Sequence, residues 1–282
     1  TRMHQVNPQI IVSFDASTLK NVFPRLLSHA LGIDSFNFHK YDDWNHPPKN
    51  FSDQKMFQRA EDVYFQHEDS DTYTIDHVRN TWFNQRGEML PVILSEGNWN
   101  AAYGPTDERI QQMAGAVRTG LVLRTGILNG LSYNIYYTLN SDATWETSTY
   151  GSGRGFGMID CDSRHVASLS YNNPWYPYYV QQFIGSNLDV NDPLLETVSS
   201  SADVRTLAWR HSSKLNLLLI CKTKQLRTIH LGGISGQLQF FRIDDTSPYT
   251  SPNVQEGIIN AEDPLIMNGY TVMLLQSYTS QD

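Results

Sequence analysis

Short strand patterns alternate with helix patterns over the first half of the chain, and this order constrains the fold more than any other feature. The strand patterns are apolar or β-branched runs at Ile10–Phe14, Ile33–His39, Pro91–Ser95 and Gly130–Tyr137. Amphipathic helix patterns lie between and after them, at Leu19–Leu31, Asp53–Gln66, Ile75–Gln85, Thr106–Leu121 and Asn173–Ser186. Repeated strand–helix units predict an α/β fold in which helices pack against a parallel sheet.

The pattern changes after about Leu194. Strand patterns then follow one another at short spacing, at Val204–Arg210, Leu215–Lys222, Leu226–Leu231, Gln237–Ile243 and Tyr270–Gln276. Short strands separated by turn residues predict an antiparallel β-sandwich. We therefore expect two domains, an α/β domain at residues 1–188 and a sandwich at residues 189–282.

Four strand–helix units leave two sheet edges open, whereas eight such units close into a barrel with its catalytic groups at the carboxyl ends of the strands. We expect residues 1–188 to be the carboxyl-terminal half of a TIM (β/α)8 barrel, strands five to eight. The amino-terminal half would come from an upstream segment or a separate chain. The side chains expected to face inward and to need that half are Ile11, Phe36, Phe38, Val92, Leu94 and Ile135. Without it, the half-barrel is expected to aggregate.

Charge and composition exclude several classes of protein. The chain has 282 residues and a net charge of -8 without a run of like charges, which argues against a nucleic-acid partner. We expect no membrane span, because no apolar run approaches about 18 residues. The two cysteines, Cys161 and Cys221, are expected to be buried free thiols. An extracellular or lysosome-like secretory location is slightly favoured over the cytoplasm, on the weak evidence of the sequon Asn50-Phe-Ser52.

The run Leu90-Pro-Val-Ile-Leu-Ser-Glu-Gly-Asn-Trp-Asn100 starts as a buried strand and changes to polar residues at Glu96. The carboxyl end of a parallel strand is a rigid mount for a catalytic side chain. Glu96 is therefore the leading catalytic candidate, and the alternative is a helix cap or a structural ion pair. No phosphate-binding glycine loop, metal-ligand spacing or nucleophile elbow occurs, so we expect no metal and no organic cofactor.

The Glu96 run resembles the seventh-strand motif of clan A glycoside hydrolases. Asp34-Ser-Phe-Asn-Phe-His-Lys-Tyr41 resembles their sixth strand, which commonly ends in a His and a Tyr that line the sugar site. Gly155-Phe-Gly-Met-Ile-Asp160, followed by the Tyr171–Gln182 helix pattern, looks like the exit from strand eight. The nearest likeness is to glycoside hydrolase family 39, the β-xylosidase and α-L-iduronidase group, with families 30, 51 and 79 near. These families also append a β-sandwich.

The resemblance implies a retaining glycosidase of carbohydrate metabolism that hydrolyses a poly- or oligosaccharide, with Glu96 as the nucleophile. His39 would then hydrogen-bond a sugar hydroxyl or orient Glu96, and Tyr41 would donate to Glu96 or line the sugar site. The other candidates for substrate contact, because amides and aromatic faces suit carbohydrate OH and CH groups, are Asn98, Trp99 and Tyr137. Each of these five side chains has a structural alternative, such as a hydrogen-bonded histidine at a strand end or an aromatic ring that packs the core or a loop.

The chain departs from the family pattern in one important respect. The Asn-Glu pair that carries the general acid at strand four does not occur upstream of Glu96, and the general acid is expected to lie before residue 1. The aspartates that could substitute for it after strand ends are Asp15, Asp42, Asp43 and Asp142. The Trp expected on strand eight is replaced by Tyr136 and Tyr137. Because the acid is missing, the rival hypothesis is a non-catalytic carbohydrate-binding or structural protein on the same scaffold.

Overall fold

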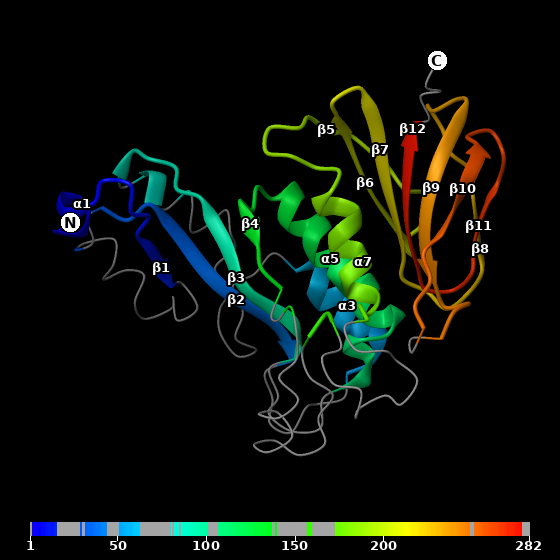
Figure 1. Ribbon diagram of the computed structural model, residues 1–282, viewed down its shortest axis with the longest axis horizontal. Coiled ribbons are helices and arrows are strands. Elements are labelled where there is room, and N and C mark those ends of the chain that lie inside the picture. Colours follow the sequence, from blue (N-terminus) through cyan, green and yellow to red (C-terminus); the bar gives the residue numbers. More distant parts are fainter. Residues whose placement is uncertain are drawn as a thin grey trace.

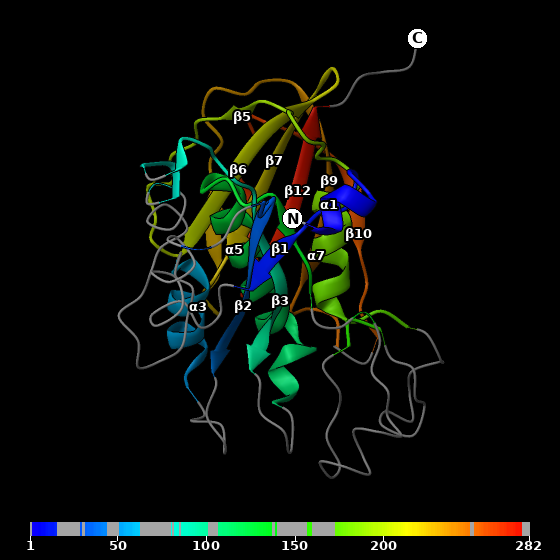
Figure 2. The ribbon, with the colours of Figure 1, turned by 90° about the vertical axis from the view of Figure 1, so that its left-hand side faces the viewer.

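The chain forms three layers: a parallel sheet, a layer of helices and antiparallel sheets (Figures 1 and 2). The computed structural model describes residues 2–15, 29, 32–43, 51–62, 80, 82–84, 86–100, 107–136, 139, 157–159, 173–248 and 251–277. The helices in the middle layer contact both sheets, and α5 contacts β3 on one side and β6, β7 and β12 on the other.

The parallel sheet contains four strands in the order β1-β2-β3-β4. Their bounds are Ser13–Asp15 for β1, Ser35–Asp43 for β2, Val92–Asn100 for β3 and Tyr133–Asn134 for β4. All three neighbouring pairs are parallel, which confirms the predicted sheet, although β1 and β4 are shorter than their sequence patterns. The carboxyl ends of the strands therefore lie at the same end of the sheet.

One face of this sheet packs against helices of the same chain. Phe36 and Phe38 of β2 and Val92 and Leu94 of β3 are buried in the main core, and Phe36 meets Trp82 edge to face at 5.2 Å between ring centroids. The prediction that these four side chains face a barrel interior and lack partners is wrong, because the helical layer covers them. The other two side chains of that set, Ile11 and Ile135, are 75% and 52% exposed.

The helices are α1 (Arg2–Val6), α3 (Asp53–Glu61), the 3-10 helix η1 (Glu108–Ile110), α5 (Met113–Leu128) and α7 (Tyr176–Gly185). The hydroxyl of Ser52 caps α3 by accepting the Lys55 backbone N–H at 3.2 Å, and Asp53 places a carboxylate at the positive end of the helix dipole. The helix predicted from Thr106 becomes a separate 3-10 turn followed by α5.

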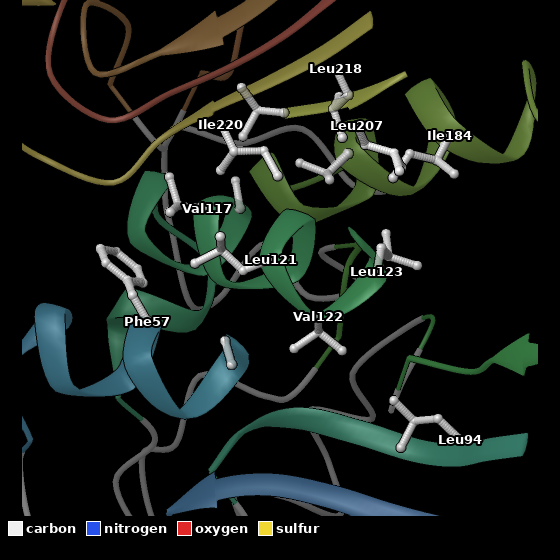
Figure 3. Packing of buried hydrophobic residues seen from close by; sticks show 14 of the residues in the cluster. Phe57, Leu94, Val117, Leu121, Val122, Leu123, Ile184, Leu207, Leu218 and Ile220 are labelled. Atoms are coloured by element: carbon white, nitrogen blue, oxygen red, sulfur yellow. The ribbon is translucent and has the colours of Figure 1, made fainter. Parts of the chain in front are cut away.

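Helix α5 is buried along almost its whole length because a sheet lies on each side of it (Figure 3). Val117 and Leu121 are completely buried, as the sequence pattern predicted, but the polar Arg118 is buried as well. A Cβ atom on Gly120 would lie 3.1 Å from Ile220 Cδ1, so glycine permits the close approach of α5 to β7.

The six-stranded antiparallel sheet has the order β10-β9-β12-β7-β6-β5. Its strands are β5 (Leu194–Leu195), β6 (Val204–His211), β7 (Lys214–Cys221), β9 (Gln237–Asp244), β10 (Gln255–Asn260) and β12 (Thr271–Ser277). A separate pair contains β8 (Arg227–Ile229) and β11 (Leu265–Met267). The five predicted strand segments all form strands, whereas β5, β10 and β11 had not been predicted.

Side chains of β12 point alternately to the two faces of the antiparallel sheet, so this strand contributes to two hydrophobic clusters. Val272 and Leu274 belong to the main core with the helices, and Met273 and Leu275 belong to a second cluster that also contains Met267 of β11. The main core takes side chains from both sides of residue 188, and the division into two domains at that point stays a prediction.

Two smaller predictions concern cysteines and membrane spans. Cys221 is a buried free thiol, as predicted, and Cys161 lies outside the described residues. Within the described ranges, no helix combines the length and the apolar character that a bilayer span requires.

Candidate active site

A β-bulge determines the direction of Glu96. In the register of β2 and β3, Phe38 pairs with Leu94 but His39 pairs with Glu96, so Ser95 is an extra residue on β3. Strict alternation after Leu94 would turn Glu96 toward the helices. The extra residue instead brings Glu96 to the same face as His39, which is a recurrent use of bulges near active sites.

Glu96 lies beside two of the predicted site residues. The Tyr41 hydroxyl donates a hydrogen bond to Glu96 Oε2 at 2.9 Å, and His39 Nδ1 lies 3.3 Å from the same oxygen. The side chains of Glu96 and His39 are 35% and 29% exposed. The arrangement therefore presents an oriented carboxylate that a ligand can reach.

Asn98 is the register partner of Tyr41 and lies further along the same face. Its Oδ1 accepts hydrogen bonds from the Trp99 backbone N–H at 2.6 Å and from the Tyr136 hydroxyl at 3.2 Å. Burial raises the pKa of the Tyr136 phenol, which keeps this donor protonated. The Asn98 side chain is 1% exposed and accepts the Tyr136 hydroxyl, and its predicted contact with a sugar stays a prediction.

Trp99 had also been predicted to contact a sugar, and its position does not support that role. Its side chain is 1% exposed and meets Phe57 of α3 edge to face at 6.5 Å between ring centroids. The Arg109 guanidinium lies 5.0 Å from the Trp99 ring centroid. The ring therefore packs on the helical side of the sheet. Tyr137, the fifth predicted contact, lies outside the described residues.

Asp42 is excluded as a replacement general acid by its surroundings. It is 1% exposed, accepts a hydrogen bond from Arg118 Nε at 2.5 Å, and has Lys40 Nζ 3.6 Å from its other oxygen. Burial lowers the pKa of Lys40, although Asp42 opposes this effect. Asp142 and the side chains of Asp15 and Asp43 lie outside the described residues.

The buried cluster of Lys40, Asp42 and Arg118 was not predicted from the sequence. Charged residues at alternate positions of a strand, together with two arginines, Arg118 and Arg124, in a mostly apolar helix, were the available signal. Two more hydrogen bonds fix the cluster, since Lys40 Nζ donates to the backbone oxygens of Arg59 at 2.7 Å and Asp62 at 2.8 Å. It lies directly behind the face that carries His39 and Tyr41.

The site offers one positioned carboxylate, a phenol donor and an imidazole. Across the described part of the chain, no group of three or more His, Cys, Asp or Glu side chains is arranged to hold a metal ion. The available chemistry is therefore that of a carboxylate nucleophile or base with neighbouring hydrogen-bond donors.

No protein-family model matches the chain, and no curated protein sequence matches it either. Solved glycosidase structures do resemble it. An α-L-arabinofuranosidase from Thermotoga maritima matches with a TM-score of 0.61 and 11% identity over 98% of this chain and 59% of that chain. A family 30 endoxylanase from Clostridium papyrosolvens matches with a TM-score of 0.53 and 11% identity over 97% of this chain and 57% of that chain.

A family 86 β-porphyranase from Bacteroides plebeius matches with a TM-score of 0.55 and 11% identity, over 96% of this chain and 48% of that chain. The neighbours are TIM-barrel glycosidases, and the chain spans about half of their length. At these identities the likeness establishes a glycosidase-type fold, and a specific likeness to family 39 is not shown.

Proposed function

We propose that the chain is the nucleophile-bearing half of a retaining glycoside hydrolase of the clan A type. In this proposal, residues 1–188 supply strands five to eight of the barrel and residues 189–282 supply a β-sandwich. The observation that carries the proposal is the Glu96 carboxylate in the middle of β3 (Val92–Asn100), which accepts a hydrogen bond from the Tyr41 hydroxyl and lies beside His39.

The proposed reaction uses Glu96 as the nucleophile. A carboxylate oxygen of Glu96 attacks the anomeric carbon, the bond from that carbon to the leaving oxygen breaks, and a general acid protonates the leaving oxygen. Water then hydrolyses the glycosyl ester on Glu96. Tyr41 orients the carboxylate through its hydrogen bond, and His39 is placed to contact a sugar hydroxyl or to help orient Glu96.

We propose that strands one to four and the general acid belong to an amino-terminal half, as an upstream segment or a separate chain. Two observations support this part of the proposal. The parallel sheet ends in β1 and β4, with no further strand paired to either among the described residues, and the solved neighbours are about twice as long. The substrate would be a poly- or oligosaccharide, and a secretory location stays the expectation.

The test uses the complete protein, with the amino-terminal half present. Glu96→Gln should remove nearly all hydrolysis of aryl glycosides while the melting temperature stays within a few degrees, because Glu and Gln are close in volume. The matched control is Glu256→Gln on β10, an exposed glutamate that should keep full activity.

Covalent trapping gives a second measurement. A 2-deoxy-2-fluoro aryl glycoside should leave a glycosyl ester on the peptide that contains Glu96, detected by mass spectrometry. Near-native turnover of Glu96→Gln would place the nucleophile elsewhere. A complete protein that binds oligosaccharides and cleaves none would instead favour the non-catalytic alternative.

A further inference from the structure

A polar groove lies between α3 and one end of the antiparallel sheet, and Glu96 is not among its lining residues. Its volume is about 680 Å³. The charged and amide side chains that line it include Lys55, Gln58 and Glu61 of α3 and Asp203, Lys222 and Lys224 from the turns that flank β6 and β7. A groove of this size can hold several sugar units.

Both carboxylates of the groove are already neutralised by cations. Glu61 accepts a hydrogen bond from Lys222 Nζ at 2.7 Å and another from Arg205. Asp203 accepts one from Arg227 Nε at 3.1 Å. Glu61 therefore has two cationic partners, and Asp203 has one.

Two further lysines add positive charge at the groove. The Lys55 ammonium lies 3.4 Å from Gln58 Oε1, a neutral acceptor. Lys224 is 72% exposed and lies 3.5 Å from Asp53, whose carboxylate is also paired with Arg109 at 2.8 Å. The residues that line the groove therefore include three lysines, Lys55, Lys222 and Lys224, beside two carboxylates, in a chain with a net charge of -8.

The aromatic rings at the groove do not favour a neutral sugar. Phe57 and Tyr270 line it but are 1% and 6% exposed, so neither offers a flat face for stacking. What the groove presents is ammonium and amide donors, which match the oxygens of carboxylate or sulfate groups.

We propose that this groove binds an acidic stretch of the carbohydrate substrate through its carboxylate or sulfate groups. The proposal rests on the proposed glycosidase function and adds a substrate class to it. Lys55 and Lys224 supply the exposed cations, and the ion pairs that Glu61 of α3 makes with Lys222 and Arg205 connect the two walls of the groove.

The experiment measures binding by calorimetry with the complete protein. An oligogalacturonate should bind, and an uncharged cello-oligosaccharide of the same length should not. Lys55→Glu combined with Lys224→Glu should weaken the binding at least about tenfold, and added salt should weaken it in the wild type. A sulfated oligosaccharide in parallel identifies which anionic group is preferred.

Matched control variants isolate the contribution of the two lysine charges. Lys214→Glu, an exposed lysine at the opposite end of β7 from Lys222, should leave the affinity unchanged, and Lys55→Gln with Lys224→Gln should give a smaller loss than charge reversal. Glu96→Gln should also leave the affinity for the oligogalacturonate unchanged. A loss of catalysis can then be told apart from a loss of binding in the groove. Equal binding of the neutral oligosaccharide, equal binding of single-stranded DNA, or unchanged affinity in the double reversal would overturn the proposal.

Discussion

The two faces of the sheet formed by β2 and β3 differ in almost every property. The helix-facing side carries Phe36 and Leu94, which are completely or almost completely buried. The opposite side carries His39 and Glu96, each about one third exposed and held by polar contacts. The same two strands therefore provide stability on one side and a reactive carboxylate on the other, and the rigid side fixes the geometry of the reactive side.

The helix-facing side is also not uniformly apolar. Toward the carboxyl end of β2 the buried aromatic side chains give way to Lys40 and Asp42, which meet Arg118. This buried charge lies behind the reactive side chains, where the sheet would otherwise need only apolar packing. A buried ion pair of this kind is costly to break, because removing one partner leaves a charge without compensation.

The largest contrast between the faces should appear in a pair of alanine substitutions on neighbouring residues. Phe36→Ala should lower the free energy of unfolding by about 3–5 kcal/mol, because it leaves a cavity beside Trp82. Asn37→Ala, on the opposite face, should cost about 1 kcal/mol or less. It removes an exposed hydrogen bond to Ser13 Oγ at 2.8 Å and a long one from Ser95 Oγ at 3.4 Å, and the Ser95 hydroxyl keeps the Phe38 backbone oxygen as an acceptor. Urea denaturation of both variants measures the difference. Equal losses would show that the second face is as tightly packed as the first.

A smaller loss should follow when the buried charge is broken. Arg118→Met should cost about 3 kcal/mol, near the lower end for a broken buried pair, because Lys40 still lies 3.6 Å from Asp42. The double variant with Asp42→Leu should recover part of that loss, since it removes both charges. Thermal unfolding gives the comparison.

The matched control for this prediction is Arg124→Met on the same helix. Among the described residues, Arg124 Nε donates a hydrogen bond to the Thr206 backbone oxygen at 2.7 Å, and losing this bond should cost about 1 kcal/mol. If the double variant were less stable than Arg118→Met alone, the cluster would be a net stabilising network and not a tolerated buried charge.

The order of the strands could be predicted from the sequence. Which face of each strand packs against the helices could not. Apolar runs such as Val92–Leu94 identify a strand, and alternation along β2 separates Phe36 and Phe38 from His39 and Tyr41. Alternation does not say which face the helices cover. The face that carries Phe36 and Phe38 was predicted to line a barrel interior, but Phe36 is buried beside Trp82 in the core that contains the helices.

Two other features of the structure were not predicted, a backbone irregularity in β3 and a strand made mostly of polar residues. The bulge at Ser95 depends on the register of β3 with β2. No residue type in Val92–Asn100 predicts it from the sequence. Strand β10, Gln255–Asn260, was missed because Gln255, Glu256, Gly257 and Asn260 do not have strand propensity. The sequence patterns ended the two strands at His39 and Ser95, whereas β2 continues to Asp43 and β3 to Asn100. Glu96 therefore meets His39 and Tyr41 in the middle of the paired strands.

The smallest effect on stability, and the sharpest test of the division between the faces, is expected from Tyr41→Phe. The Tyr41 ring is 5% exposed and keeps its packing, so only the hydroxyl that donates to Glu96 is lost. Because Glu96 is 35% exposed, water can replace this donor, and the loss should be about 0.5–1.5 kcal/mol. In the complete protein, kcat should fall more than KM changes, since the carboxylate loses its orientation.

The control variant is Tyr133→Phe on β4. Tyr133 is 63% exposed, and the variant should change neither stability nor kcat. A loss from Tyr41→Phe as large as that from Phe36→Ala would mean that the hydroxyl stabilises the fold, and the two faces would then no longer divide stability from reactivity.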